Sequence, residues 1–134
     1  MRKAIVLLGL LLFASAAVAQ TQPQWKVIQS VTLTKQTAEI PVTTLFTPTA
    51  EGFYRVSAYI SAGGPTGGNW TLYFQWTDIM GGVPLYGAQV YFDDGSNFDS
   101  AMFTFVEKPG TPFTYYTNGT AGSYNIAFTV EQLK

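Results

Sequence analysis

The sequence contains no cysteine and no histidine, and charged residues make up only 11% of its 134 residues. Without cysteine the chain forms no disulfide bond, so its stability must come from a packed core. The absence of both residue types excludes the Ser-His-Asp and Cys-His nucleophile systems and the common zinc sites. No glycine-rich loop opens a helical pattern, so a phosphate-binding cradle is excluded as well. We therefore expect a protein that is not an enzyme.

The first 19 residues are predicted to form a cleavable signal peptide. Arg2 and Lys3 precede an apolar run that reaches Phe13, and the segment closes with the small residues Ala-Val-Ala at 17–19. This order of charge, apolar run and small residues is typical of a secretory signal. The uncharged stretch is shorter than the roughly 20 residues of a spanning helix. We expect a secreted protein, extracellular or periplasmic, in which residues 20–134 form a single domain.

Positive charge is scarce in the expected mature chain. Loss of Arg2 and Lys3 leaves five cations against eight acids, a net charge of −3. The remaining cations are scattered along the chain and form no basic stripe that follows a phosphate backbone. This pattern argues against a nucleic-acid partner, and removal of the signal peptide leaves no segment that would insert into a membrane.

Short segments of alternating apolar and polar residues recur along residues 20–134, and glycine, proline, asparagine and aspartate separate them. Such spacing is typical of an all-β sandwich or barrel. The predicted strands are Trp25–Thr34, Ala38–Thr47, Phe53–Ser61, Trp70–Asp78, Leu85–Phe92, Ser100–Glu107, Phe113–Thr117 and Ser123–Gln132.

The alternation also predicts which side chains form the core. Successive side chains of a strand point to opposite faces, so the strands at 53–61, 70–78 and 123–132 each have one apolar and one mostly polar face. Packing two sheets on their apolar faces satisfies all three segments. Trp70 and Trp76 fall on apolar faces and are expected in the core. The predicted fold is an antiparallel two-sheet β-sandwich of about eight strands, of jelly-roll type.

Two short segments resemble a known family. Residues 44–48 (TLFTP) followed by 51–56 (EGFYRV) are similar to the phenylalanine … glycine-x-tyrosine-x-valine strand pair of C1q/TNF-like jelly-roll modules, of the kind seen in bacterial and phage surface proteins. Residues 122–128 (GSYNIAF) resemble the last strand of that superfamily. The resemblance implies a trimer-forming binding module rather than an enzyme.

Carboxylates are the remaining groups with catalytic or metal-binding chemistry. A glycosidase needs two facing acids, whereas the acids of this chain mostly fall near strand ends or on polar faces, where they solvate the surface and form turns. Asp93, Asp94 and Asp99 lie within seven residues and offer oxygen ligands that suit calcium. The alternative is an ordinary hairpin, because Asp94-Gly95 is a turn signal between two strands.

Exposed aromatic residues suggest a second kind of site. Tyr59, Tyr73 and Tyr91 fall on the polar side of their strands, where they would form a platform for a carbohydrate or part of a protein interface. Scattered, unrelated exposure is the alternative interpretation.

Apolar residues on the polar side of two strands suggest an interface. In the strand at 100–107, Met102 and Val106 lie opposite the inward Phe103 and Phe105, and Leu85 has a similar position in the strand at 85–92. A monomer gains nothing by exposing such residues, whereas an oligomer buries them.

The sequence therefore favours a secreted, non-catalytic, self-associating interaction module whose partner is itself or another extracellular protein. A carbohydrate-binding module is the alternative. No cofactor is expected apart from the calcium considered above.

Overall fold

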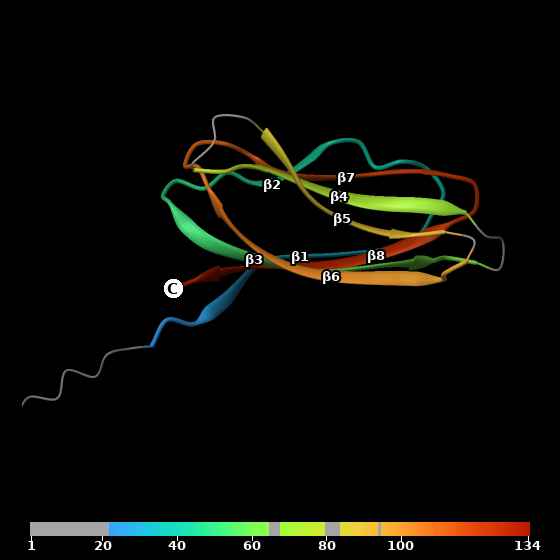
Figure 1. The fold of residues 1–134 in the computed structure, drawn as a ribbon, viewed down its shortest axis with the longest axis horizontal. Helices are drawn as coiled ribbons and strands as arrows, with labels where there is room; N and C mark the ends of the chain where they lie inside the picture. Colours follow the sequence, from blue (N-terminus) through green and yellow to red (C-terminus); the bar gives the residue numbers. More distant parts are fainter. Residues whose placement is uncertain (1–21, 65–67, 80–83, 94) are drawn as a thin grey trace, which may run out of the picture.

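The computed structural model describes residues 22–64, 68–79, 84–93 and 95–134; the predicted signal peptide lies outside them. All secondary-structure elements in this part of the chain are β-strands, arranged in two layers (Figure 1). They are β1 (Trp25–Gln36), β2 (Thr43–Phe46), β3 (Gly52–Ala62), β4 (Asn69–Thr77), β5 (Pro84–Phe92), β6 (Phe98–Glu107), β7 (Phe113–Thr120) and β8 (Tyr124–Leu133).

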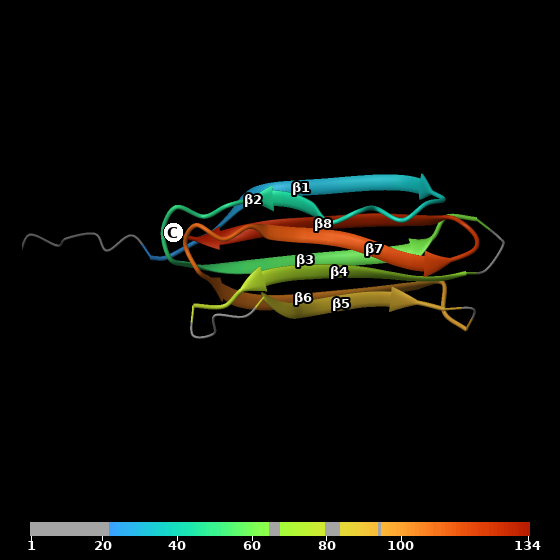
Figure 2. The ribbon, with the colours of Figure 1, turned by 90° about the horizontal axis from the view of Figure 1, so that it is seen from above.

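The strands form two four-stranded antiparallel sheets. Sheet A has the order β1-β8-β3-β6, and sheet B has the order β2-β7-β4-β5. Every connection passes from one sheet to the other except the one that joins β4 to β5. Figure 2 shows the strands of both sheets running along the long axis of the molecule. This order and these crossings define the jelly roll, so the predicted fold class is confirmed.

The core lies between the sheets, on the faces that the alternation predicted. The inward side chains of β3, β4 and β8 are buried, including Trp70, Trp76 and Phe128. Phe74 of sheet B meets Phe128 of sheet A edge to face, with ring centroids 5.0 Å apart and an interplanar angle of 88°. Each fully buried side chain of this size contributes roughly 1.5–3 kcal/mol to stability. The aromatic core therefore takes the place of disulfides.

The expected alternation does not continue unbroken along β5. Ala88 pairs with Phe74, but the next residue of β4, Gln75, pairs with Tyr86, and Trp76 then pairs with Leu85. Two residues of β5 thus span a single step of β4, which shifts the register as a β-bulge does. The register of β5 against β4 therefore changes between Ala88 and Tyr86.

Candidate functional site

The outer face of sheet A carries most of the exposed apolar surface of the described residues. Eight large hydrophobic side chains are exposed among the described residues, and five of the eight point outward from sheet A. They are Val27 of β1, Phe53 and Tyr59 of β3, and Phe98 and Met102 of β6. Surface hydrophobic residues usually occur singly, and a group that shares one face marks a contact surface.

The pairing of β3 with β6 brings these side chains together. Phe53 lies opposite the half-buried Val106, and the rings of Tyr59 and Phe98 stack with centroids 6.1 Å apart. Met102, of which 66% is exposed, lies opposite Ser57 between these two pairs. We call Phe53, Tyr59, Phe98, Met102 and Val106 the β3–β6 patch.

A shallow depression of about 330 Å³ lies within the β3–β6 patch. Tyr59 and Met102 form part of its lining, together with small residues of β3, β6 and β8 such as Ser57, Ser100 and Ala127. An apolar side chain presented by a partner fits such a hollow between a ring and a thioether.

The charges beside the patch are paired with each other. Arg55 Nε donates a hydrogen bond of 2.7 Å to Glu131 Oε2, and the Arg55 guanidinium lies 4.6 Å from the centre of the Trp25 ring. The hydrogen bond raises the pKa of Arg55 and lowers the pKa of Glu131. Both groups therefore stay charged and neutralise each other across β3 and β8.

The three residues expected at an interface have different positions. Met102 and Val106 point outward from β6, as expected, and belong to the β3–β6 patch. Leu85 lies on β5 in sheet B, opposite Trp76 in the register, and its side chain lies outside the described residues. The two edge strands β5 and β6 lie near each other, although their sheets face opposite ways.

The three tyrosines expected at a binding platform do not share one face. Tyr59 points outward from sheet A, whereas Tyr73 and Tyr91 point outward from sheet B on β4 and β5. Tyr73 stacks instead on Tyr116 of β7, with ring centroids 4.7 Å apart and nearly parallel planes. The sequence identifies each ring as outward but contains no signal for which sheet it joins.

The acidic segment that follows β5 is organised by its own hydrogen bonds. Asp93 Oδ1 accepts from the backbone N–H groups of Gly95 and Ser96, and Asp93 Oδ2 accepts from the Tyr91 hydroxyl at 2.8 Å. The bond from Tyr91 is the main cause that lowers the pKa of Asp93. Asp99 accepts from the backbone N–H groups of Tyr91 and Ser100.

These bonds are those of a turn whose aspartates bond to neighbouring backbone. Asp94 lies outside the described residues, and among the residues described no three acids lie close enough together to hold a metal ion. The hydrogen bonds account for the described carboxylates without a metal.

One acid does not follow the expectation that carboxylates lie at the surface. Glu107 is fully buried, and neither of its carboxylate oxygens has a hydrogen-bond partner. Burial raises its pKa to about 8. Glu107 stands at a strand end, where most acids were expected, but the inward alternation of Phe103 and Phe105 continues to it, and this alternation is the sequence signal for its burial.

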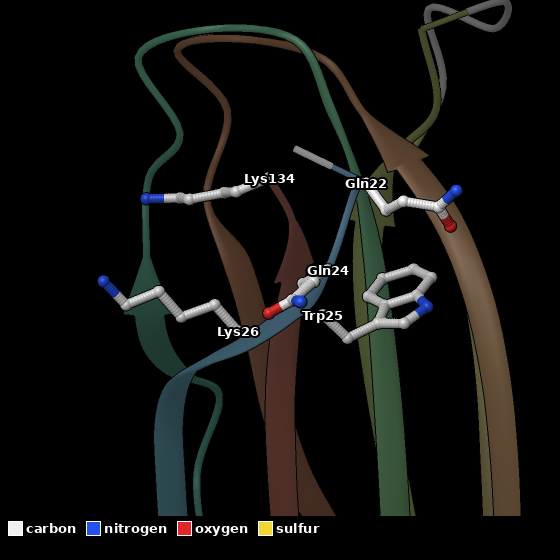
Figure 3. A pocket seen from close by; sticks show the side chains of 5 residues that line it. All are labelled: Gln22, Gln24, Trp25, Lys26 and Lys134. Carbon is white, nitrogen blue, oxygen red and sulfur yellow. The ribbon is translucent and has the colours of Figure 1, made fainter. Parts of the chain in front are cut away.

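A second hollow, of about 460 Å³, lies where β1 begins and the chain ends. Gln24 and Lys134 pair there through two backbone hydrogen bonds. Figure 3 shows the side chains of Lys26 and Lys134 extending to one side and the Trp25 ring lying on the other. The two cations and the aromatic ring therefore do not face one another.

Comparison with protein families, curated proteins and solved structures found no match to this chain. No helix in the described residues is long and apolar enough to cross a membrane.

Proposed function

We propose that this protein is a secreted, non-catalytic interaction module that self-associates through the outer face of sheet A. The observation that carries the proposal is the β3–β6 patch: five apolar or aromatic side chains on one face, two of which, Tyr59 and Met102, line a shallow hollow. Water-exposed apolar surface of this kind is stabilised when a partner covers it.

The charge pattern of the face supports a second copy of the chain as the partner. In β3, β6 and β8, Arg55 and Glu131 are the charged side chains that point outward, and they bond to each other within one chain. Two copies placed face to face over these three strands therefore bury no unpaired charge. An isologous contact requires a self-complementary patch, which a neutral apolar surface with a hollow provides.

The non-catalytic part of the proposal depends on the side chains available. The usual nucleophile systems need histidine or cysteine, and the sequence has neither. The described carboxylates of Asp93, Asp99 and Glu131 accept hydrogen bonds from their own chain, and Glu107 is closed off from any substrate. A face-to-face contact of this kind gives a dimer, whereas the C1q/TNF-like resemblance favours a trimer, whose contacts join two different surfaces; the measured mass of the assembly distinguishes the two.

Sedimentation of the mature protein with the double substitution Met102→Glu and Val106→Lys tests the proposal. Burying these two charges in an interface is costly, so we expect the parent to sediment as an oligomer and the variant as a folded monomer. Val42→Glu is the matched control, because Val42 is equally exposed but precedes β2 and lies outside the patch. A parent that is monomeric at high micromolar concentration refutes self-association.

A further inference from the structure

We propose that the outer face of sheet B is a second, independent binding surface, and that it binds an uncharged polysaccharide through a row of tyrosines. The row consists of Tyr116 of β7, Tyr73 of β4 and Tyr91 of β5, and we call it the tyrosine row. This surface lies on the opposite side of the sandwich from the β3–β6 patch.

The strand register places the tyrosine row across three neighbouring strands. Tyr116 and Tyr73 are direct cross-strand partners, and their rings stack with an interplanar angle of 9°. Tyr91 pairs with Thr71, which makes it the diagonal neighbour of Tyr73 on the same face. Diagonal neighbours on a sheet lie roughly 7–8 Å apart, within reach of one extended ligand.

The ring of Tyr91 is held in place before any ligand binds. Its hydroxyl donates to Asp93 Oδ2 at 2.8 Å, while 47% of the residue is exposed. A side chain that is ordered in advance loses less entropy on binding. The exposed part of this ring is therefore available to a ligand.

Sheet B has no charged residue in any of its four strands. Sheet A, by contrast, has charged residues in every strand. Apart from the tyrosines, the described outward positions of sheet B are hydroxyl or amide residues. They are Thr44, Asn69, Thr71, Gln75, Thr77, Gln89, Asn118, Thr120 and the buried Thr114.

This chemistry matches an uncharged sugar polymer. Sugar rings present C–H groups that pack on aromatic rings and hydroxyls that exchange hydrogen bonds with hydroxyl and amide side chains. The strands of sheet B contain no arginine to anchor a protein partner, and Val42, exposed just before β2, is the aliphatic side chain beside this face. An anionic glycan or a phosphate-bearing surface would find no cation in these four strands.

Affinity electrophoresis of the mature protein tests the proposal. The gels contain hydroxyethyl cellulose, xyloglucan or galactomannan as neutral probes, and alginate as the charged control. We expect at least one neutral polymer, and not alginate, to retard the protein. Because no ion pair is involved, raising the salt concentration should leave the retardation unchanged.

Substitutions then locate the site. Tyr91→Ala and Tyr73→Ala should each weaken binding about tenfold or more, the usual effect of removing a binding hot spot. Tyr73→Phe keeps the stacked ring and should retain most of the binding, which separates ligand contact from folding. Tyr59→Ala, on the outer face of sheet A, is the matched control; because Tyr59 belongs to the β3–β6 patch, the control is made in the monomeric Met102→Glu and Val106→Lys background, where polymer binding should be unchanged.

The proposal is overturned if no neutral polymer retards the protein, or if Tyr59→Ala weakens binding as much as Tyr91→Ala does. If Tyr73→Ala fails to fold, Tyr91→Ala alone decides, because its ring is exposed. The monomeric variant with Met102→Glu and Val106→Lys should still bind the polymer. Loss of self-association and loss of sugar binding are thus separate results.

Discussion

Glu107, the last residue of β6, pairs with Asp78, just beyond the end of β4, in an isolated antiparallel bridge that joins sheet A to sheet B. Beside the bridge, the Lys108 N–H donates to the carbonyl oxygen of Thr77 at 2.8 Å. This junction closes one end of the sandwich over the inward side chain of Glu107. The carboxyl group is therefore enclosed in an apolar core. There the ionised form is destabilised by the loss of water, so the protonated form is favoured.

The burial of Glu107 makes stability depend on pH. Its pKa is about 8 in the folded chain, against 4.5 for the free group, so the folded state holds the proton more tightly than the unfolded state does. Stability should therefore fall as pH rises from about 4.5 to about 8, by up to about 5 kcal/mol, and level off above. Chemical denaturation across this pH range measures the loss.

Glu107→Gln should remove most of this pH dependence and should be more stable than the parent at pH 8. Burial is the cause that raises the pKa of Glu107, and the charge of Glu107 in turn helps to raise the pKa of Tyr54 of β3. Glu51→Gln, at an exposed acid, is the matched control and should keep the dependence. A parent whose stability rises between pH 5 and pH 8 would contradict this account.

The aromatic core should dominate stability. Trp76→Ala and Phe128→Ala each remove a buried ring and should cost about 3–5 kcal/mol, a large share of the stability of a small domain. Phe53→Ala removes an exposed ring from the same sandwich and should cost far less. Thermal melts of the three variants check the assignment, and near-identical melting temperatures would show that the inward and outward faces are wrongly assigned.

The alternation of the sequence predicted the core because burial depends on a local period of two. Trp70 and Phe128 are buried, and Tyr59 and Met102 exposed, as the alternation required. The sheet to which each strand belongs depends instead on pairings between distant segments, which a local period does not encode. For this reason Tyr59 and Tyr73 had the same interpretation in the sequence but lie on opposite faces of the molecule.

Two further features needed the three-dimensional structure. The pairing of β4 with β5 shifts in register between Phe74 and Gln75, and nothing in the spacing of apolar residues marks the shift. The alternation along β6 places Glu107 inward, whereas the general preference of acidic residues for the surface predicts that it is exposed. The bridge to Asp78 that closes over it is a contact between distant segments.

The turn that follows β5 should form without calcium. Because Asp93 and Asp99 already accept hydrogen bonds from Tyr91, Gly95 and Ser100, we expect the same melting temperature with and without a chelator. Asp93→Ala should lower the melting temperature because it removes these bonds, whether or not calcium is present. A chelator-sensitive melt that Asp94→Asn abolishes would instead favour the calcium site.

Secretion is tested by the mass of the exported protein. Cleavage after Ala19 predicts a chain that begins at Gln20, with or without cyclisation of that glutamine, because the Ala-Val-Ala triplet has the small residues that signal peptidases accept. Mass spectrometry of the protein recovered outside the cytoplasm measures this directly. A mass that retains Met1 would argue against export.

Salt should distinguish an apolar interface from one held by ion pairs. The outward charges of β3, β6 and β8 are Arg55 and Glu131, and they already bond to each other within one chain. Raising the salt from about 0.05 M to about 0.5 M shortens the screening length several-fold and weakens exposed charge contacts between chains. The burial of Met102, Phe53 and their neighbours does not depend on charge contacts between chains. The dissociation constant of the assembly, measured by sedimentation, should therefore stay constant or fall. An assembly that dissociates as salt rises would mean that charged residues outside the β3–β6 patch hold the copies together, and the interface would have to be placed elsewhere on the molecule.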